Sequence, residues 1–216
     1  MRVTGVRTFH PRRGRLRARH HDALARLMPV YGIPAEGPAD ASSLFGADLP
    51  LVVEIGSGMG EATAEMAAAD PGRGYLAVEI HTPGVANLLA TVEERGLTNV
   101  RVFFGDALGL LRERVAAGTL DAVHAFFPDP WPKARHHKRR LFQPVHVALL
   151  ASRLRPGGTI RCATDSPGYA AAMVETLGAD PLLIPGNGRI PRPVTKFEQR
   201  ARDAGRAVVD LVYTRR

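Results

Sequence analysis

Short apolar runs alternate with longer stretches of helical periodicity over most of the sequence. The apolar runs cover residues 51–55, 74–80, 101–104, 122–127 and 159–163. The helical stretches between them cover residues 61–69, 84–95, 108–117 and 144–154. Such alternation is typical of βαβ units, in which a parallel sheet is buried between two layers of helices. We therefore predict an α/β fold with a mostly parallel sheet and helices on both faces.

The two ends of the sequence differ from this pattern. Residues 1–19 are rich in arginine and lack periodicity, residues 20–28 have one apolar helical side, and residues 32–49 contain scattered Pro, Gly, Ala and Ser. Residues 208–214 are apolar and β-branched, which favours a final strand. We predict a basic N-terminal arm, a short helix and a linker over residues 1–49, followed by one compact domain over residues 50–216.

The chain is basic, with 29 Lys and Arg residues against 21 Asp and Glu residues and a formal net charge of +8. This balance favours an acidic partner, most simply nucleic acid, although a high arginine content can also reflect the composition of a genome. The single cysteine, Cys162, excludes an internal disulfide and is consistent with a reducing compartment. No apolar stretch resembles a signal peptide or a membrane-spanning helix, so we expect a cytoplasmic protein with no membrane partner.

Acidic residues mark the ends of three successive apolar runs. These residues are Glu54, Glu79 and Asp106. In an open α/β sheet the carboxyl ends of the strands meet at one edge, where ligands bind, and an acid after the second strand accepts hydrogen bonds from ribose hydroxyls. Asp106, next to Ala107, could equally cap the following helix. Together the three acids indicate a ligand that contains a nucleoside.

A glycine-rich segment follows the first apolar run. Gly56, Gly58 and Gly60 permit a tight turn and the close approach of a ligand to the next helix. A dinucleotide fingerprint needs glycine where this chain has Glu61, whose charge is unfavourable beside a pyrophosphate. The spacing therefore disfavours a dehydrogenase, and a purely structural turn stays open as an alternative.

Residues 127–141, FPDPWPKARHHKRRL, follow the fourth apolar run. Three prolines fix φ and remove backbone donors around Asp129 and Trp131, which predicts a stiff, extended segment. Trp131 can stack on a base or brace the prolines. The dense run of cations that follows predicts a polyanion beside the carboxylate. An irregular loop with a solvated basic surface is the alternative.

Residues 128–140 resemble the PDPWxKxRHxKRR signature of bacterial tRNA (guanine-N7)-methyltransferases. The GxGxG segment after Glu54 also resembles the first motif of class I S-adenosylmethionine-dependent methyltransferases. Further segments that match the tRNA family in order are EIGSGMG at 54–60, EIHTPG at 79–84, TD at 164–165 and RPVTKFEQR at 192–200. The resemblance extends from about residue 50 to the C-terminal end, and residues 13–16 match more loosely. It implies a Rossmann-like class I methyltransferase fold, whose mostly parallel, twisted sheet has an antiparallel strand near the C-terminus.

The chain departs from the family pattern at a few positions. Ala201 replaces a frequent glycine, Ser57 replaces a frequent phenylalanine, and Arg17 and His20 stand where threonine and glutamine are usual. None of these changes removes an acid on which the predicted chemistry depends.

The resemblance implies a role for each matching residue. The predicted ligands of S-adenosylmethionine are Glu54, Gly56, Gly58, Gly60, Glu79, Asp106, Ala107 and Asp129. The predicted guanosine contacts are Lys133, Asp165, Thr195, Lys196, Phe197 and Glu198. The predicted tRNA contacts are Arg135, His136, His137, Lys138, Arg139 and Arg140. The implied activity is methyl transfer to N7 of a tRNA guanosine, at position 46 of the variable loop.

Asp129 is the predicted catalytic residue. N7 of guanine carries a lone pair and no proton, so the reaction needs positioning of the reactants and no base. The purine becomes cationic as the new bond forms, and a fixed carboxylate stabilises that charge. Asp129 could act on the guanine, on the cofactor or on both. His136 and His137 lack spaced metal-ligating partners, so no metal is expected. The sequence leaves a monomer or a homodimer open.

Two other functions compete with this one. Another class I nucleic-acid methyltransferase, acting on an exocyclic amine through an Asn-Pro-Pro-Tyr-type motif, would need Asn and Tyr where this chain has Asp129 and Trp131. A catalytically inactive RNA-binding relative would explain the charge, but the intact glycine segment and strand-end acids argue against it.

Overall fold

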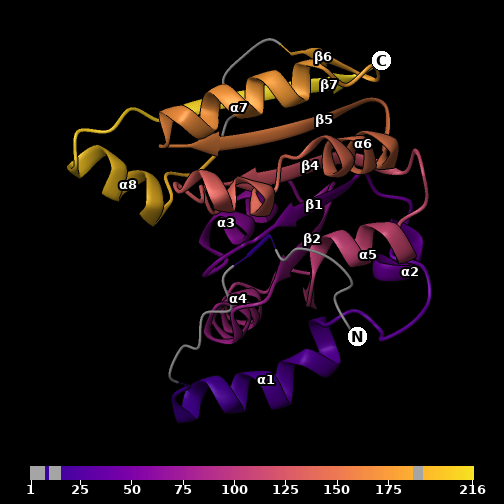
Figure 1. Ribbon diagram of the computed structural model, residues 1–216. Coiled ribbons are helices and arrows are strands. Elements are labelled where there is room, and N and C mark those ends of the chain that lie inside the picture. Colours follow the sequence, from indigo (N-terminus) through magenta and orange to yellow (C-terminus); the bar gives the residue numbers. More distant parts are fainter. Residues whose placement is uncertain (1–7, 10–15, 187–191) are drawn as a thin grey trace.

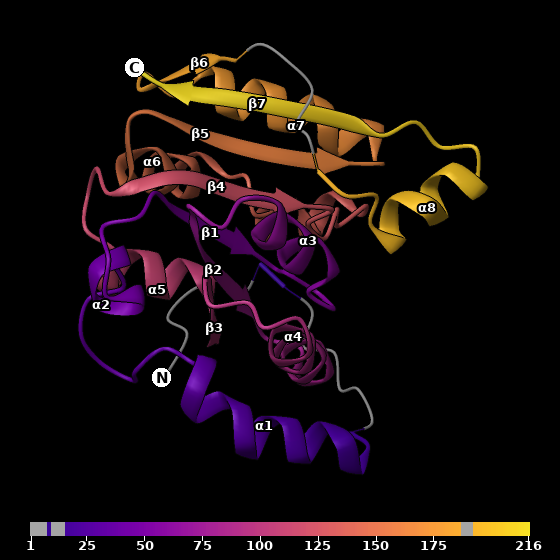
Figure 2. The same ribbon diagram turned by 180° about the vertical axis from the view of Figure 1, so that it is seen from behind.

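The computed structural model describes residues 8–9, 16–186 and 192–216, and its centre is a seven-stranded sheet (Figures 1 and 2). In spatial order the strands are β3 Val100–Phe104, β2 Gly74–Glu79, β1 Leu51–Ile55, β4 Leu120–Phe126, β5 Leu154–Thr164, β7 Val209–Arg215 and β6 Leu183–Pro185. Strands β1 to β5 pair in parallel, whereas β7 is antiparallel to both β5 and β6. The predicted mostly parallel sheet with an antiparallel strand near the C-terminus is confirmed.

Helices cover both faces of the sheet, and each face has its own hydrophobic core. One core contains α1 Ala18–Tyr31, α3 Glu61–Ala69 and α4 Thr82–Glu94. The other contains α2 Ala41–Phe45, α5 Ala107–Arg114, α6 Pro144–Arg153 and α7 Pro167–Gly178. Two short helices lie outside these layers: the 3-10 helix η1 Ala134–Arg139 after β4, and α8 Lys196–Asp203 before β7. None of the described helices has both the length and the apolar character that a bilayer crossing needs.

The central strand β4 shows why its sequence is a nearly continuous apolar run. Successive side chains of a strand point to opposite faces, and both faces are covered here. Val123 and Ala125 therefore enter one core, while Ala122 and Phe126 enter the other.

The N-terminal helix α1 packs beside α4 (Figures 1 and 2). Ala23 and Leu27 are buried in the same core as α4, and the Arg26 guanidinium donates to Glu93, with Nη2 at 2.9 Å from Oε2. Most of the predicted basic arm, residues 1–7 and 10–15, lies outside the described residues, as does most of the loosely matching motif at 13–16. The domain boundary at residue 50 stays a prediction.

The predicted linker over residues 32–49 contains the packed helix α2. The Asp40 side chain accepts a hydrogen bond from the Ser43 N–H at 2.8 Å and so caps the helix, and Gly46, at φ +71°, ends it. Ala41 and Leu44 are buried in the core of that face. The segment predicted as a linker therefore contains a short packed helix, and its role as a linker stays a prediction.

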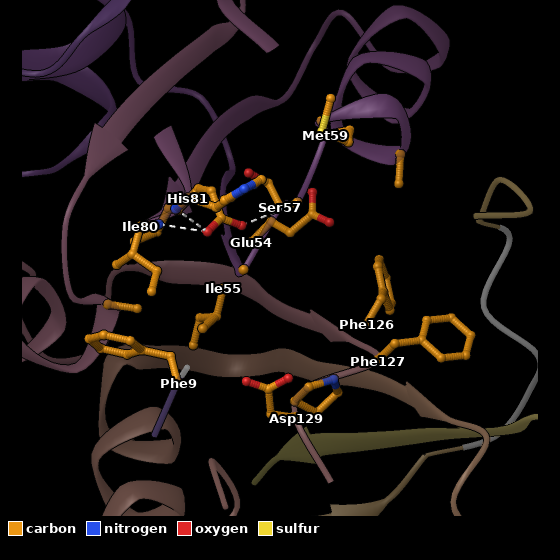
Figure 3. Close-up of a pocket in the computed structure, with 18 of the residues that line it drawn as sticks. Phe9, Glu54, Ile55, Ser57, Met59, Ile80, His81, Phe126, Phe127 and Asp129 are labelled. Carbon is orange, nitrogen blue, oxygen red and sulfur yellow. Dashed lines mark hydrogen bonds between the residues drawn. The ribbon is translucent and has the colours of Figure 1, made fainter. Parts of the chain in front are cut away.

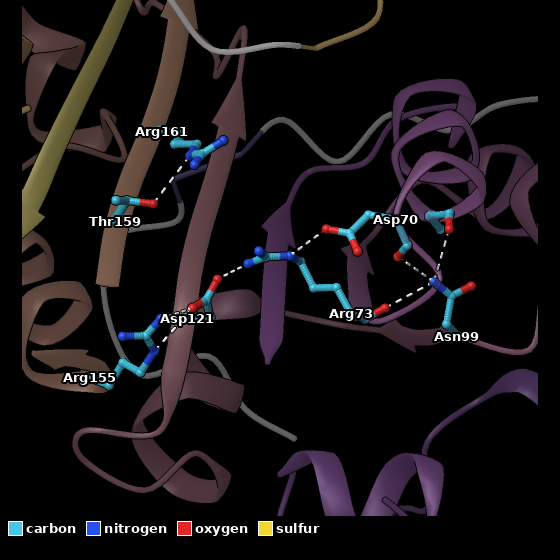
Figure 4. Close-up of polar contacts among 8 residues, drawn as sticks. Asp70, Arg73, Asn99, Asp121, Arg155, Thr159 and Arg161 are labelled. Carbon is cyan, nitrogen blue, oxygen red and sulfur yellow. Dashed lines mark hydrogen bonds and ion pairs between the residues drawn. The ribbon is translucent and has the colours of Figure 1, made fainter. Parts of the chain in front are cut away.

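Polar contacts hold the amino ends of neighbouring strands at the edge opposite the strand-end acids (Figure 4). Asp121, at the start of β4, accepts from Arg155 Nε at 3.0 Å and forms an ion pair with Arg73, just before β2. Asn99, just before β3, donates to the carbonyls of Ala67 and Arg73 at 3.0 and 2.9 Å. Because these contacts align the amino ends of parallel strands, the carboxyl ends meet at the other edge.

Candidate active site

A cavity of about 360 Å³ lies where the carboxyl ends of β1 to β4 meet (Figure 3). Its wall combines residues that follow these strands with residues of α8 and with Thr8 and Phe9. The predicted cofactor ligands all line it: Glu54, Gly56, Gly58, Gly60, Glu79, Asp106, Ala107 and Asp129. The structure thus brings these residues to one place, as expected for strand ends of an open α/β sheet. Their individual roles stay predictions.

The glycine segment after β1 has a backbone that only glycine adopts easily. Gly56, Gly58 and Gly60 have φ values of +75°, +59° and +79°. L side chains rarely occupy this region, so the three glycines are needed for the turn itself. The turn leads directly into α3, whose N-terminus carries the positive end of the helix dipole.

Glu79 holds this turn in place. Its Oε2 accepts from the Gly58 N–H, and its Oε1 accepts from the N–H groups of Ile80 and His81, each at 2.7 Å (Figure 3). A carboxylate has about four acceptor positions. Glu79 therefore has acceptor capacity left for a ligand hydroxyl, although much of its function here is to fix the backbone around the cavity.

Glu54 is the most deeply buried acid of the cavity wall, with only 3% of its surface exposed. The pKa of Glu54 is raised to about 7, mainly by burial and to a lesser degree by the charge of Glu79. A hydrogen bond from the Thr63 hydroxyl lowers this pKa but does not outweigh burial. The carboxyl group therefore changes its charge near neutral pH, whereas an exposed glutamate is ionised there.

The raised pKa of Glu54 predicts a pH-dependent stability. Between the ordinary value of 4.5 and about 7 the folded state binds more protons than the unfolded state, so stability falls as the pH rises through this window. Glu54→Gln removes this titration. From about pH 5 to about pH 8 the free energy of unfolding of the parent should fall by roughly 2 to 3 kcal/mol more than that of the variant. Denaturant unfolding without cofactor at the two pH values measures this, and an unchanged difference would contradict it.

Asp106 combines the two roles that the sequence left open. Its side chain accepts from the Gly109 N–H at 3.0 Å and caps α5. It also lines the cavity together with Ala107. A helix cap uses one acceptor position of the carboxylate, so capping does not prevent contact with a ligand.

Asp129 lies in the proline-rich segment after β4 and lines the cavity, and in the view of Figure 3 its carboxylate lies between Phe9 and Phe127. The segment is not simply extended, as the prolines predicted, because Phe127 and Trp131 have φ values of +54° and +45° and turn the chain. Such conformations cost energy in residues other than glycine and persist only where the surroundings enforce them.

Trp131 is a buried bracing residue with 3% of its surface exposed. The Arg139 guanidinium lies 4.9 Å from its ring centroid, and the His136 ring meets it edge-on at 5.8 Å. Its Nε1 donates to the Thr8 carbonyl at 3.4 Å. Of the two alternatives for Trp131, bracing the loop fits this placement, and stacking on a base does not.

The N-terminal part of helix α8, together with the residue before it, supplies another part of the cavity wall. Thr195 caps the helix by accepting from the Glu198 N–H at 3.1 Å, and Thr195, Lys196 and Phe197 line the cavity. The Phe197 ring stacks on Phe127 at 6.2 Å. Three of the predicted guanosine contacts are therefore at the cavity.

The other predicted guanosine contacts lie outside the cavity wall. Glu198 is buried and forms ion pairs with Arg192 and Arg202, both at 2.5 Å. Burial disfavours its charged form, but the two arginines outweigh this and lower the pKa of Glu198. Asp165 pairs with Arg206 at 2.9 Å, and Lys133 is exposed at the surface. Glu198 therefore anchors α8, and its placement does not support the prediction that it contacts guanosine.

Comparison with known proteins connects this site to one family. A family model described as putative methyltransferase matches residues 48–211. A tRNA (guanine-N(7)-)-methyltransferase of Streptomyces avermitilis is 50% identical over 97% of this chain and 75% of its own length. The enzyme of the same name from Bordetella pertussis is 47% identical over 99% of this chain and 86% of its own length. The chain belongs to the tRNA (guanine-N7)-methyltransferase family.

Solved structures that resemble this family member confirm the predicted Rossmann-like class I methyltransferase fold. The 16S rRNA methyltransferase KamB has a TM-score of 0.61 at 17% identity and covers 86% of this chain and 98% of its own. The 16S rRNA (adenine(1408)-N(1))-methyltransferase from Catenulisporales acidiphilia has a TM-score of 0.52 at 15% identity, and it covers 77% of this chain and 85% of its own. At these identities the likeness concerns the fold alone.

The basic run of this family member forms η1 and differs in exposure from residue to residue. Lys133, Arg135 and Lys138 are exposed, while His136, His137 and Arg139 are half-buried. Arg140 is buried, with 7% of its surface exposed. The predicted tRNA contacts are therefore not equivalent: the burial of Arg140 does not favour a contact with phosphate, and the role of each residue stays a prediction.

Several residues of the cavity wall were missed by the sequence analysis. They include Phe9, Met59, Phe127 and Arg200. Arg200 belongs to the matching segment 192–200, and Phe127 begins the proline-rich stretch, so their positions offered a signal. Phe9 lies in the arginine-rich arm, where neither periodicity nor a motif marks it.

Proposed function

We propose that this chain transfers a methyl group from S-adenosylmethionine to N7 of a guanosine in tRNA, in the cytoplasm. The observation that carries this proposal is one cavity, lined by strand-end acids, in a member of a family whose relatives are named tRNA (guanine-N(7)-)-methyltransferases. The net charge of +8 and the exposed cations of η1 fit a polyanionic substrate.

The residues of the cavity suit a cofactor with a cationic group, a ribose and an adenine. The glycine turn and the N-terminus of α3 allow a carboxylate to approach the backbone. Glu79 retains acceptor capacity for ribose hydroxyls, and Asp106 with Ala107 lies at the third strand end, where the adenine is proposed to bind. When bound, S-adenosylmethionine supplies an electrophilic methyl group on a sulfonium.

The protein's contribution to the reaction is orientation and electrostatics. The N7 lone pair of guanine would form the new bond to the methyl carbon while the bond from that carbon to the donor sulfur breaks and the sulfur leaves as a neutral thioether. No proton leaves N7, so no residue of the cavity has to act as a base. Positive charge grows on the purine during this step. The Asp129 carboxylate, fixed in the cavity, is proposed to stabilise that charge.

Guanosine is proposed to enter between the Asp129 segment and α8. Thr195, Lys196 and Phe197 are already at the cavity, and Arg200 adds a further cation to the wall. Lys133 follows the Asp129 segment in the sequence and Asp165 directly follows β5, and both remain proposed contacts of the nucleoside or its phosphate. Because a base inside folded tRNA cannot reach such a cavity, the guanosine must leave its stacked position to react.

The test is to map methylation on a defined tRNA. Purified protein is incubated with an unmodified tRNA transcript and labelled cofactor, and 7-methylguanosine is located by chemical cleavage. We expect a single product at position 46 of the variable loop and no product in a transcript that carries adenosine there. Label at another guanosine would overturn the assigned position, and absence of 7-methylguanosine would overturn the activity.

A further inference from the structure

The cations of the basic run after Asp129 differ in burial, and Arg140 is the most buried of them. The Arg140 guanidinium donates from Nε to the Pro130 carbonyl at 2.9 Å, and its Nη2 lies 3.0 Å from His137 Nε2. The same group lies 4.8 Å from the centroid of the Tyr169 ring. Within the described part of the chain, no carboxylate forms an ion pair with Arg140.

A buried guanidinium is costly unless its donors are used. Here the partners of Arg140 are a backbone carbonyl, an imidazole and an aromatic face, and none of them is an anion. Its position therefore makes it unsuited to neutralise phosphate, which needs an exposed cation. It is well suited to hold the segment to which it donates.

The segment around Asp129 has few backbone donors of its own, so side chains such as Trp131 and Arg140 contribute to its conformation. Pro128, Pro130 and Pro132 have no backbone N–H to donate. Phe127 and Trp131 have positive φ, a conformation that persists only where neighbouring contacts enforce it. The hydrogen bond to the Pro130 carbonyl fixes the residue directly after Asp129.

The Tyr169 ring, on which the Arg140 guanidinium lies, belongs to the buried core. Tyr169, on α7, has no exposed surface, and its hydroxyl accepts from the Phe142 N–H at 3.3 Å. Arg140 thus links the Asp129 segment to a helix of the core on one face of the sheet. Lys133, Arg135 and Lys138 of the same run extend into solvent and make no comparable contact with the segment.

We propose that Arg140 is a positioning residue that holds the Asp129 segment in its reactive geometry, whereas the exposed cations Lys133, Arg135 and Lys138 of the same run contact tRNA phosphate. The proposal rests on the proposed methyl transfer to tRNA. According to this proposal, one continuous basic motif contains a buried residue that serves catalysis, Arg140, and exposed residues that serve tRNA binding.

The test compares Arg140→Met and Arg140→Lys with Lys138→Met, which serves as the reference for the loss of one phosphate contact. For each variant we would measure kcat at saturating tRNA and cofactor, and tRNA affinity as a function of salt. Arg140→Met is expected to lower kcat by roughly 10- to 100-fold, because small misplacements of reacting groups have effects of this size. For this variant, the slope of log tRNA affinity against log salt concentration should equal that of the parent. Lys138→Met should lower that slope by about 0.7 to 0.9, which corresponds to one phosphate contact, whereas Arg140→Met should not.

Arg140→Lys separates positioning from charge. Lysine keeps the cation but lacks the planar fork that reaches Pro130 while lying over Tyr169. We expect it to retain the parent salt slope with kcat still at least about fivefold below the parent, since the misplaced segment is not restored. Cofactor affinity and the thermal midpoint are measured alongside, and loss of both with kcat would show a merely structural role and overturn the proposal.

Two further results would contradict the assignment. Full turnover in Arg140→Met would show that the segment does not depend on this contact. A reduced salt slope with unchanged kcat would make Arg140 a phosphate contact after all. Failure of the proposed activity itself would appear in the parent protein, before any variant is compared, so the two hypotheses can be judged separately.

Discussion

Replacing Asp129 with asparagine is expected to lower the methylation rate at saturating tRNA and cofactor by roughly 10²- to 10³-fold. The change keeps the size of the side chain and removes its charge. As the bond to N7 forms, the purine acquires positive charge, and a fixed carboxylate in the cavity stabilises this charge more in the transition state than in the ground state. Affinity for tRNA should change little, because most of it comes from contacts between cations and phosphates, and Asp129 makes none of these.

The measurement is a single-turnover rate together with tRNA and cofactor affinities. Asp48→Asn is the matched control, since Asp48 is exposed and does not line the cavity. It should leave rate and affinities unchanged. A turnover within about threefold of the parent in Asp129→Asn would remove this residue from the chemistry. Loss of cofactor or tRNA affinity with a normal rate at saturation would make it a binding residue.

The acids of the site could be predicted from sequence because topology alone places them. Parallel strands joined by helices bring their carboxyl ends to one edge, whatever packs around them. Glu54, Glu79, Asp106 and Asp129 therefore meet at one cavity, and the alternation of runs and helices was sufficient to expect it. The glycine segment could be interpreted in the same way, because its positive φ values follow from the turn that joins β1 to α3.

The direction of individual charged side chains could not be predicted in this way. Arg140 and Lys138 belong to one run of cations, but η1 turns one into the core and leaves the other in solvent. Glu198 stands in a motif beside three cavity residues and yet faces Arg192 and Arg202. Spacing does not determine burial in a short irregular helix, because tertiary contacts decide which side faces inward.

Helix α2 was missed for a different reason. Asp40 and Ser43 have the spacing of a helix cap, and Gly46 marks its end, so local signals were present. The scattered small residues around them favoured a linker. Only the packing of Ala41 and Leu44 against the sheet distinguishes the two possibilities.

Replacing Gly84 with alanine is expected to weaken cofactor binding by at least about 100-fold. Gly84 follows Pro83 in the first turn of α4, and a Cβ there would lie 2.1 Å from the carbonyl oxygen of Gly58. The new Cβ is fixed to the backbone of residue 84 and the oxygen to the backbone of Gly58, so neither atom can rotate away. Gly58 would have to move, and with it the turn that Glu79 holds through the Gly58 N–H at 2.7 Å. The substitution therefore displaces the cavity wall without adding a polar group or a charge.

Gly168→Ala is the control, because Gly168 follows Pro167 in the first turn of α7 in the same way, but a Cβ there meets nothing within 4 Å. It should bind the cofactor like the parent and gain up to about 1 kcal/mol in stability from the better helix propensity of alanine. Calorimetric titration with S-adenosylmethionine measures both variants. If Gly84→Ala binds as well as Gly168→Ala, the glycine turn is not part of the cofactor site, and the cavity would need another ligand. If neither variant nor the parent binds, the proposed cofactor itself is wrong.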